Sequence, residues 1–288
     1  MSDDIPAFNP GAWDTSTKGS NADLVMTDKA FNPQAALEAA KRERQKRLDP
    51  LDAPLGTIPA TSFSSLSTFE KCAYHLYLSK VEKHPDPSGP AAERGTKIHD
   101  MAEAYMRAEI DEEIPAELSK FTELFQELRA RFAEGHVHVE EDWAFTRVWD
   151  NTGWTSKDCW LRVKLDAMDR ISPTAAIVYD WKTGRKFGNE IKHGQQALLY
   201  VLAAFIRYPE LEFIESNMVY LDKGEKMTSS YSRDQAMLFF DRYNLRFNIA
   251  TTALEFTPTP NASACKWCPH AKTQEDRDMP ACGWRYGV

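Results

Sequence analysis

The sequence lacks any apolar run long enough to cross a membrane. Its longest apolar stretch, residues 197–206, falls well short of the roughly 20 residues that span a bilayer. Residues 1–11 also lack the basic and apolar segments of a secretory signal. We therefore expect a cytoplasmic protein without membrane contact.

An excess of positive charge is also absent. The 288 residues include 35 Lys and Arg against 43 Asp and Glu, which gives a net charge of -8 at pH 7. This balance argues against a protein that coats nucleic acid through bulk charge. With 42% hydrophobic and 27% charged residues, the composition is that of a soluble globular protein and excludes collagen-like and wholly disordered chains.

Cysteine is scarce as well, with five residues in the chain. In the reducing cytosol this number favours metal ligands, catalytic groups or core residues over disulfides. Cys159, beside Trp160 at the start of an expected strand, is predicted to be a small buried hydrophobe.

The N-terminal and C-terminal parts of the chain differ in character. Residues 1–58 are polar and show no sustained periodicity, so we expect a partly disordered extension. Within it, residues 33–48 are Ala-rich and end in a cluster of Lys and Arg, which predicts a short basic helix. This helix is either solvated or a DNA-contacting arm. Residues 59–288 are predicted to form one folded domain.

Periodic patterns predict both helices and strands in this domain. A helix capped by Ser64 or Ser67 ends before Pro85, and a second helix begins after Pro90. The other expected elements are a helix over 115–132, strands around 137–145, 161–169 and 175–182, a buried helix over 190–208, a hairpin of 213–221 with 226–231, and a long helix over 233–254.

Two neighbouring strands carry acidic residues at positions that favour metal chemistry. Alternation places Asp166 opposite the Leu/Val face of its strand, and Asp180 on the same face as Lys182. A hairpin would bring Asp166 beside Asp180. Buried carboxylates are costly unless something pairs with them, and Mg²⁺ or Mn²⁺ suits such oxygen ligands. An isolated Asp-x-Lys is more typical of a structural ion pair at a strand end than of a catalytic site.

A series of motifs in fixed order is more specific than any one of them. The series comprises SSLSTFEKC (64–72), RGTKIH (94–99), LRVKLDAMD (161–169), YDWKTG (179–184), QQALLY (195–200), and then Cys265, Cys268 and Cys282. It resembles the PD-(D/E)xK nuclease superfamily, in particular its RecB-type branch with an iron-sulfur cluster, which includes the CRISPR-associated adaptation nuclease and phage exonuclease relatives. The resemblance covers residues 59–282.

The resemblance implies an α/β fold with a restriction-endonuclease-like core, in which helices flank a central mixed β-sheet and a cysteine-rich cluster region lies at the C-terminus. It also implies a metal site. His99, Asp166 and Asp180 match the side-chain metal ligands, the backbone carbonyl of Trp181 matches a further ligand, and Lys182 matches the catalytic lysine.

Three other residues match positions that support the site. Gln196 and Tyr200 match a Gln-x-x-x-Tyr motif whose spacing places both on one helix face, where they would meet DNA or the active site. Arg94 matches a phosphate contact. Glu140 is a further acidic residue near the site, whereas His136 and His138 are predicted to be solvated, because no acidic partner follows at matching spacing.

The cysteines suggest a second metal centre. Cys265-x-x-Cys268 is by itself compatible with zinc, an iron-sulfur cluster or a redox pair. In the resembled branch, one N-terminal and three C-terminal cysteines bind a [4Fe-4S] cluster, which implies Cys72 and Cys282 as the other ligands. The insert 269–281 departs from the usual spacing, and His270 within it offers a competing ligand.

The function that follows is a Mg²⁺- or Mn²⁺-dependent DNA exonuclease. It would hydrolyse phosphodiester bonds in recombination, repair or phage DNA processing, in a bacterial or phage-infected cell, with DNA and a recombination or phage replication protein as partners. The alternatives are a CRISPR adaptation-type nuclease that trims captured DNA, a non-catalytic DNA-binding or assembly module, and a zinc-stabilised interaction protein.

Overall fold

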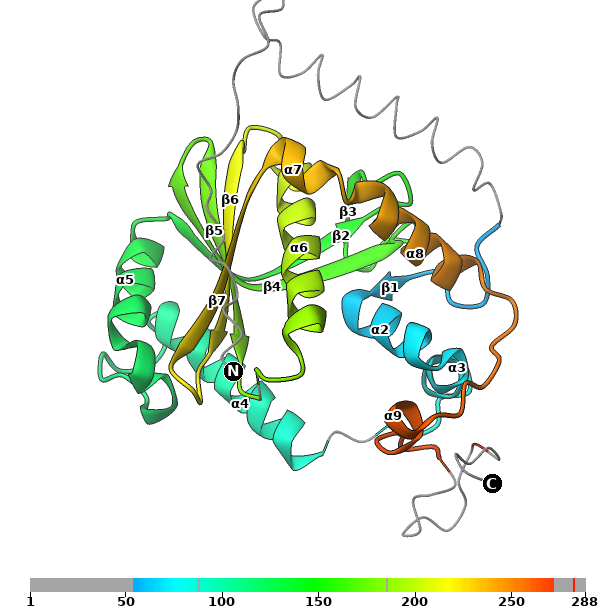
Figure 1. Cartoon of the computed structure of the whole chain (residues 1–288). Coiled ribbons are helices and arrows are strands. Elements are labelled where there is room, and N and C mark those ends of the chain that lie inside the picture. The colour runs from blue at the N-terminus through cyan, green and yellow to red at the C-terminus, as the bar shows by residue number, and fades with distance from the viewer. Residues whose placement is uncertain (1–53, 87–88, 185, 272–281, 283–288) are drawn as a thin grey trace, which may run out of the picture. The chain divides into compact units, whose positions relative to one another are not determined.

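A mixed β-sheet of seven strands lies at the centre of the fold (Figure 1). The strand order is β3-β2-β4-β5-β6-β7, with the short β1 paired beside β4. The β1–β4 and β5–β6 pairs are parallel, and the other neighbouring pairs are antiparallel. The strands are β1 (Thr61–Ser62), β2 (Val137–Phe145), β3 (Asn151–Thr152), β4 (Leu161–Ser172), β5 (Ala175–Lys182), β6 (Phe213–Tyr220) and β7 (Glu225–Ser232).

These elements come from a computed structural model, which describes residues 54–86, 89–184, 186–271 and 282. The predicted basic helix over 33–48, and all but the end of the extension that contains it, lie outside the described residues. Among the helices that the structure describes, none is long and apolar enough to traverse a bilayer.

Helices cover the sheet. They are α2 (Phe63–Lys71), α3 (Ala73–Lys80), α4 (Pro90–Met106), the 3₁₀ helix η2 (Ala116–Phe121), α5 (Thr122–Ala133), α6 (Glu190–Arg207), α7 (Arg233–Met237), α8 (Phe240–Thr252) and α9 (Ala262–Cys265). The mixed sheet with flanking helices confirms the predicted α/β fold class.

The N-terminal helix begins earlier and ends earlier than predicted. Ser62, rather than Ser64 or Ser67, caps α2, because its hydroxyl accepts the backbone N–H of Ser65 at 3.4 Å. The chain enters this helix directly from β1, whose pairing with β4 fixes its position. At Cys72 the backbone becomes extended, with φ -161°. The single expected helix is therefore two helices, with a cysteine at the junction.

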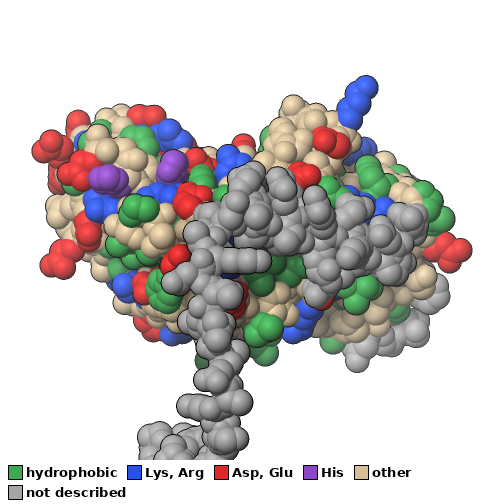
Figure 2. Space-filling model, turned by 90° about the horizontal axis from the view of Figure 1, so that it is seen from above, with side chains coloured by type: hydrophobic (Ala, Val, Ile, Leu, Met, Phe, Trp, Pro, Cys, Tyr) green, Lys and Arg blue, Asp and Glu red, His purple; other side chains and the backbone are tan. Residues whose placement is uncertain are grey.

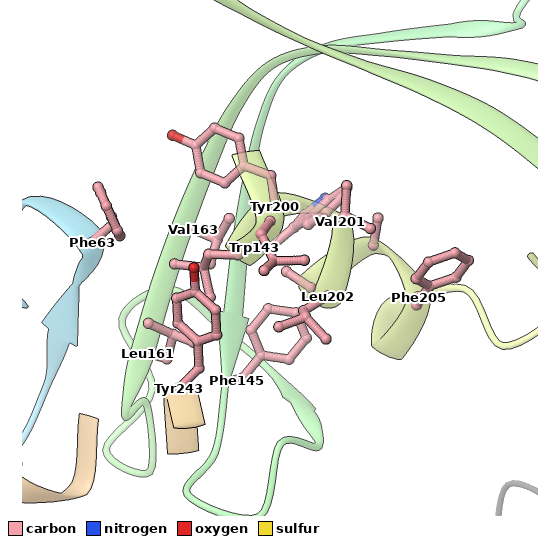
Figure 3. Close-up of a cluster of buried hydrophobic side chains, with 14 of the residues drawn as sticks. Phe63, Trp143, Phe145, Leu161, Val163, Tyr200, Val201, Leu202, Phe205 and Tyr243 are labelled. Atoms are coloured by element: carbon pink, nitrogen blue, oxygen red, sulfur yellow. The ribbon is translucent and has the colours of Figure 1, made fainter. Parts of the chain in front are cut away.

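The two larger of three apolar clusters hold the layers together. One contains side chains of α2, β4, α6 and α8, and Figure 3 shows Val163 on β4 near Tyr200, Val201 and Leu202 of α6. The other joins α4 and α5 to residues of β5 such as Trp181. Neighbouring residues of β5 divide between the clusters, with Val178 in the first and Tyr179 in the second, as the period of two requires. The sheet thus has an apolar layer on each side.

Candidate functional site

The β4–β5 hairpin brings two carboxylates together. The register pairs Ala167 with Tyr179, so the next position along the hairpin places Asp166 opposite Asp180. Both residues are buried, with exposed fractions of 7% and 3%. The backbone N–H of Trp181 donates a 2.6 Å hydrogen bond to Oδ2 of Asp166. The predicted proximity of the two aspartates is confirmed.

His99 reaches this hairpin from α4. Its Nδ1 lies 3.1 Å from Oδ1 of Asp166. Burial by itself lowers the pKa of His99, but the hydrogen bond to Asp166 and the negative charges of Asp166 and Asp180 outweigh burial, so the pKa of His99 is raised. The hydrogen bond to Asp166 and the negative charges of Asp166 and Asp180 therefore hold the His99 imidazole at the site.

Glu140 approaches the same point from β2. The register of β2 with β4 places it opposite Asp166, and its carboxylate lies with the ligand atoms of His99 and Asp166 inside a group whose members are all within 4.8 Å of one another. Its φ of 51° is in the left-handed region, which is uncommon for a side chain with a Cβ. Burial, opposed by a contact with Lys164, raises the pKa of the Glu140 carboxyl. Glu140 thus belongs to the site geometrically.

Lys182 at the end of β5 and Gln196 on α6 complete the arrangement. The Lys182 ammonium contacts Oδ2 of Asp180 and donates to Oε1 of Gln196 at 3.0 Å. The Gln196 amide nitrogen donates to Oδ1 of Asp180 at 3.2 Å and to the Tyr200 hydroxyl at 2.6 Å. Burial, followed by the negative charges of Asp180 and Asp166, raises the pKa of Tyr200 well above its usual value. This network fixes the direction in which Lys182 points.

The residues present fit a divalent cation. Oδ2 of Asp180 and Oε2 of Glu140 are buried and accept no hydrogen bond of ordinary geometry, although each lies beside a lysine ammonium. The ligand atoms of His99, Glu140 and Asp166 all lie within 4.8 Å of one another, and Asp180 lies across the hairpin from Asp166. Imidazole and carboxylate groups of this kind suit Mg²⁺ or Mn²⁺. Lys164 and Lys182 compensate part of the negative charge of these clustered carboxylates, and a bound divalent cation would compensate the rest.

The Trp181 side chain points away from this set. It is 1% exposed, and its ring lies 4.8 Å from that of Phe125 on α5. Only the backbone of Trp181 is therefore left to take part in the site, which agrees with the role predicted for its carbonyl.

Arg94 lies in an ion pair. Its guanidinium donates to both carboxylate oxygens of Asp222 in the β6–β7 turn, at 2.9 and 2.7 Å. Lys120 donates to the backbone carbonyl of the same aspartate. The sequence did not indicate Asp222, because it lies 128 residues after Arg94 and no local sequence pattern connects the two residues. A phosphate contact by Arg94 would have to compete with this pair.

The four predicted cluster cysteines surround one pocket. Cys72 lies at the α2–α3 junction, Cys265 ends α9, Cys268 follows on the next turn, and Cys282 pairs with Ala271 in a short parallel bridge. All four line the pocket, and within the part of the chain that the structure describes they form no disulfide. Burial, with the nearby Cys72 and Cys282, raises the pKa of the Cys268 thiol. The four cysteines thus share one pocket, although no three of their sulfurs belong to a described group of ligand atoms that all lie within 4.8 Å of one another.

His270 belongs to a different group of side chains. Its Nε2 lies 3.1 Å from the Ser79 hydroxyl, and it forms a set with His75 and Asp86 whose ligand atoms are within 4.8 Å of one another. His75 of this set lines the cysteine pocket, so the competing ligand belongs to a group that adjoins the pocket. Cys159, in contrast, is 6% exposed, as predicted for a core residue.

His136 and His138 are partly exposed, with side-chain values of 53% and 37%. The premise that no acidic partner stands at matching spacing does not hold for His138, since its Nδ1 lies 2.9 Å from Oε1 of Glu141 three residues on. The left-handed backbone at Glu140 interrupts the alternation of β2, and this interruption hid the pairing in the sequence.

Comparisons with known proteins bear on the whole domain. Residues 60–273 match the family model of the PD-(D/E)XK nuclease superfamily. Among solved structures, a match is described as "Crystal structure of SSO0001", with 16% sequence identity, coverage of 80% of this chain and 93% of that chain, and a TM-score of 0.43. No curated protein matches the sequence.

Proposed function

The chain belongs to the PD-(D/E)XK nuclease superfamily, which implies a metal-dependent nuclease, and we propose that it is a Mg²⁺- or Mn²⁺-dependent DNA exonuclease. Asp166, Asp180 and Lys182 are the proposed catalytic residues.

The observation that carries this proposal is the convergence of residues from four elements on one buried point. His99 of α4 meets Asp166 of β4, while Asp180 and Lys182 of β5 meet Gln196 of α6. A structural ion pair between Asp180 and Lys182 would need neither the imidazole nor the second carboxylate. This arrangement therefore supports a catalytic role over a non-catalytic DNA-binding module.

The proposed ligands of the divalent cation are His99, Asp166, Asp180 and the carbonyl of Trp181. Glu140 lies within reach of the same cation. When bound, a divalent cation lowers the pKa of a coordinated water and neutralises charge on phosphate oxygens.

The chain's own groups supply orientation and charge. Gln196 accepts one hydrogen bond from Lys182 and donates another to Asp180, so the ammonium is held beside the metal-binding carboxylate. There Lys182 can stabilise negative charge that develops on the scissile phosphate. The Tyr200 hydroxyl limits the rotation of the Gln196 amide through its 2.6 Å contact. Gln196 and Tyr200 are thus proposed as positioning residues.

We also propose that Cys72, Cys265, Cys268 and Cys282 bind a [4Fe-4S] cluster, with zinc as the alternative. Their common pocket supports this assignment. Cys72 precedes strands β2–β7 in the chain and the other three cysteines follow them, so a shared cluster would close a very long loop and stabilise the domain.

The biological setting belongs to the proposal as well. Recombination, repair or phage DNA processing in a bacterial or phage-infected cytoplasm would supply linear DNA ends, and a recombination or phage replication protein would be the natural partner. The proposed domain comprises residues 59–288, preceded by the extension 1–58. Trimming of captured DNA in CRISPR adaptation is the alternative setting for the same chemistry.

The proposal is tested by comparing linear DNA with a covalently closed circle of the same sequence. We expect progressive release of nucleotides from the linear DNA when Mg²⁺ or Mn²⁺ is present, none in EDTA, and no cleavage of the circle. Cleavage of the circle would contradict the exonuclease assignment, and intact linear DNA with both cations would contradict nuclease activity.

A further inference from the structure

A cavity of about 480 Å³ adjoins the candidate active site. Gln196 and Tyr200 line it, and Gln196 also contacts Lys182 and Asp180. Gln196 therefore lies between the cavity and the residues proposed to cleave the phosphodiester. Its opposite wall is formed by Ser62, Ser64 and Ser65 at the start of α2.

Four cationic side chains line this cavity, namely Lys80 of α3, Arg162 and Lys164 of β4, and Lys192 of α6. Lys164 contacts Glu140 at the metal-binding end. For Lys80 and Lys192, no described residue supplies a side-chain hydrogen bond or an ion pair. These two ammonium groups are available to an anion that enters from solvent.

The surroundings of Lys192 indicate a local excess of positive charge. Partial burial is the largest cause that lowers the pKa of the Lys192 ammonium, and the positive charges of Lys71 and Lys182 lower it further. The overall net charge of -8 conceals this excess. On the face shown in Figure 2, basic and acidic side chains are interspersed, so a local cavity rather than a broad basic surface would attract a polyanion.

An aromatic side chain completes the cavity. Trp154, in the loop before β4, lines it, and the Arg162 guanidinium lies 5.4 Å from the indole centroid. Nε of Arg162 also donates to the Trp154 carbonyl at 3.1 Å, which fixes the two groups together. An aromatic ring combined with cations along a groove is typical of sites that bind single-stranded nucleic acid, since bases stack on the ring and phosphates meet the cations.

We propose that this cavity binds the single-stranded DNA segment adjacent to the scissile phosphate, with a base against Trp154 and phosphates against Lys80 and Lys192. The inference rests on the proposed function and adds a substrate class to it. Single-stranded DNA is favoured over duplex because a base must be unpaired and unstacked before it can reach the indole ring. A duplex end would have to be opened before it entered.

The test measures binding separately from cleavage. Fluorescence anisotropy of a labelled 12-nucleotide single strand, and of the matching duplex, is recorded with the full chain and without added divalent cation. We expect the Trp154→Ala variant to bind the single strand about 5- to 150-fold more weakly, which corresponds to the loss of one stacked base. Trp154→Phe should stay close to the wild type because it keeps a stacking ring.

The lysines are tested through the salt dependence of binding. Removal of Lys80 and Lys192 together should reduce the slope of log K against log salt concentration by about 1.4, since each phosphate contact on a single strand contributes about 0.7. Lys226→Ala, on the exposed surface of β7, is the matched control and should leave the slope unchanged. Circular dichroism melting of each variant checks the fold.

The inference is overturned if Trp154→Ala and the double lysine variant both bind the single strand like the wild type, or if duplex binds more tightly than the single strand. Parallel cleavage assays of the wild type with Mn²⁺ keep the two claims apart. Wild-type cleavage of single strands with unchanged binding by the variants would leave the nuclease assignment in place, whereas absence of any wild-type cleavage would remove the proposed function itself.

Discussion

The backbone N–H of Trp181 donates a 2.6 Å hydrogen bond to the Asp166 carboxylate. Strand β5 therefore positions Asp166 of the neighbouring strand and also carries Asp180, the second acidic residue of the site. This contact to a side chain lies just beyond Ala167 and Tyr179, the pair at which the printed register of the two strands ends. The site is built into the hairpin itself and does not depend on a loop for its geometry.

Gln196 is predicted to act through Lys182. Gln196→Leu removes the acceptor for Lys182 and the donor for Asp180, so we expect kcat for DNA cleavage to fall by roughly 10- to 100-fold with little change in KM. The reason is that loss of a hydrogen bond to a charged group costs about 1.5–3 kcal/mol. Steady-state kinetics on a labelled single strand measures the two constants.

Tyr200→Phe provides the comparison, because it removes only the hydroxyl that accepts from Gln196. Its effect on kcat should be smaller than that of Gln196→Leu. Equal kcat in the wild type and Gln196→Leu would contradict the positioning role.

The cysteine assignment predicts a specific loss of metal. After anaerobic purification, Cys72→Ala should contain less iron than the wild type and should melt at a lower temperature, because a ligand that closes a long loop is lost. Cys159→Ala is the matched control, since Cys159 is buried outside the pocket, and it should keep its iron. A wild-type protein with stoichiometric zinc and no iron would decide in favour of zinc.

The lowered pKa of the Glu141 carboxyl leads to a prediction of how the free energy of unfolding depends on pH. Burial by itself raises its pKa, but hydrogen bonds with His138 and Trp143 outweigh burial and lower the pKa to about 2. A carboxyl with a lowered folded-state pKa stabilises the fold above its unfolded value near 4.5, and this contribution is lost as the pH falls toward 2.

Urea unfolding at pH 6 and pH 3 tests this prediction. Because Glu141→Gln lacks a titrating carboxyl, we expect it to lose less stability than the wild type between these two values, by an amount of order 1–2 kcal/mol after allowance for partial exposure. Identical losses in the two proteins would show that Glu141 does not contribute in this way.

Local pattern predicted much of the fold. The alternation of polar and apolar residues located β4 and β5, and the hairpin that it implied places Asp166 opposite Asp180. The almost continuous apolar run of α6 predicted its burial, and Pro90 at the first turn predicted the start of α4. Each of these features depends on residues that are close together in the chain.

Contacts between distant residues were beyond the reach of such patterns. The pairing of Arg94 with Asp222 depends on how α4 packs beside the β6–β7 turn. The left-handed backbone at Glu140 brings a third carboxylate to the site and has no signal in the sequence, because no glycine or asparagine marks it. The gathering of the cysteines was expected only through family resemblance.

The central claim is that Asp180 and Lys182 carry out metal-dependent hydrolysis of DNA. The most direct test measures cleavage of end-labelled linear DNA with Mg²⁺ or Mn²⁺. The variants compared are Asp180→Asn and Lys182→Ala, with Lys226→Ala as the control. We predict that the first two variants lose at least about 100-fold in rate, whereas Lys226→Ala cleaves like the wild type. Wild-type rates in both Asp180→Asn and Lys182→Ala would contradict the assignment of the active site.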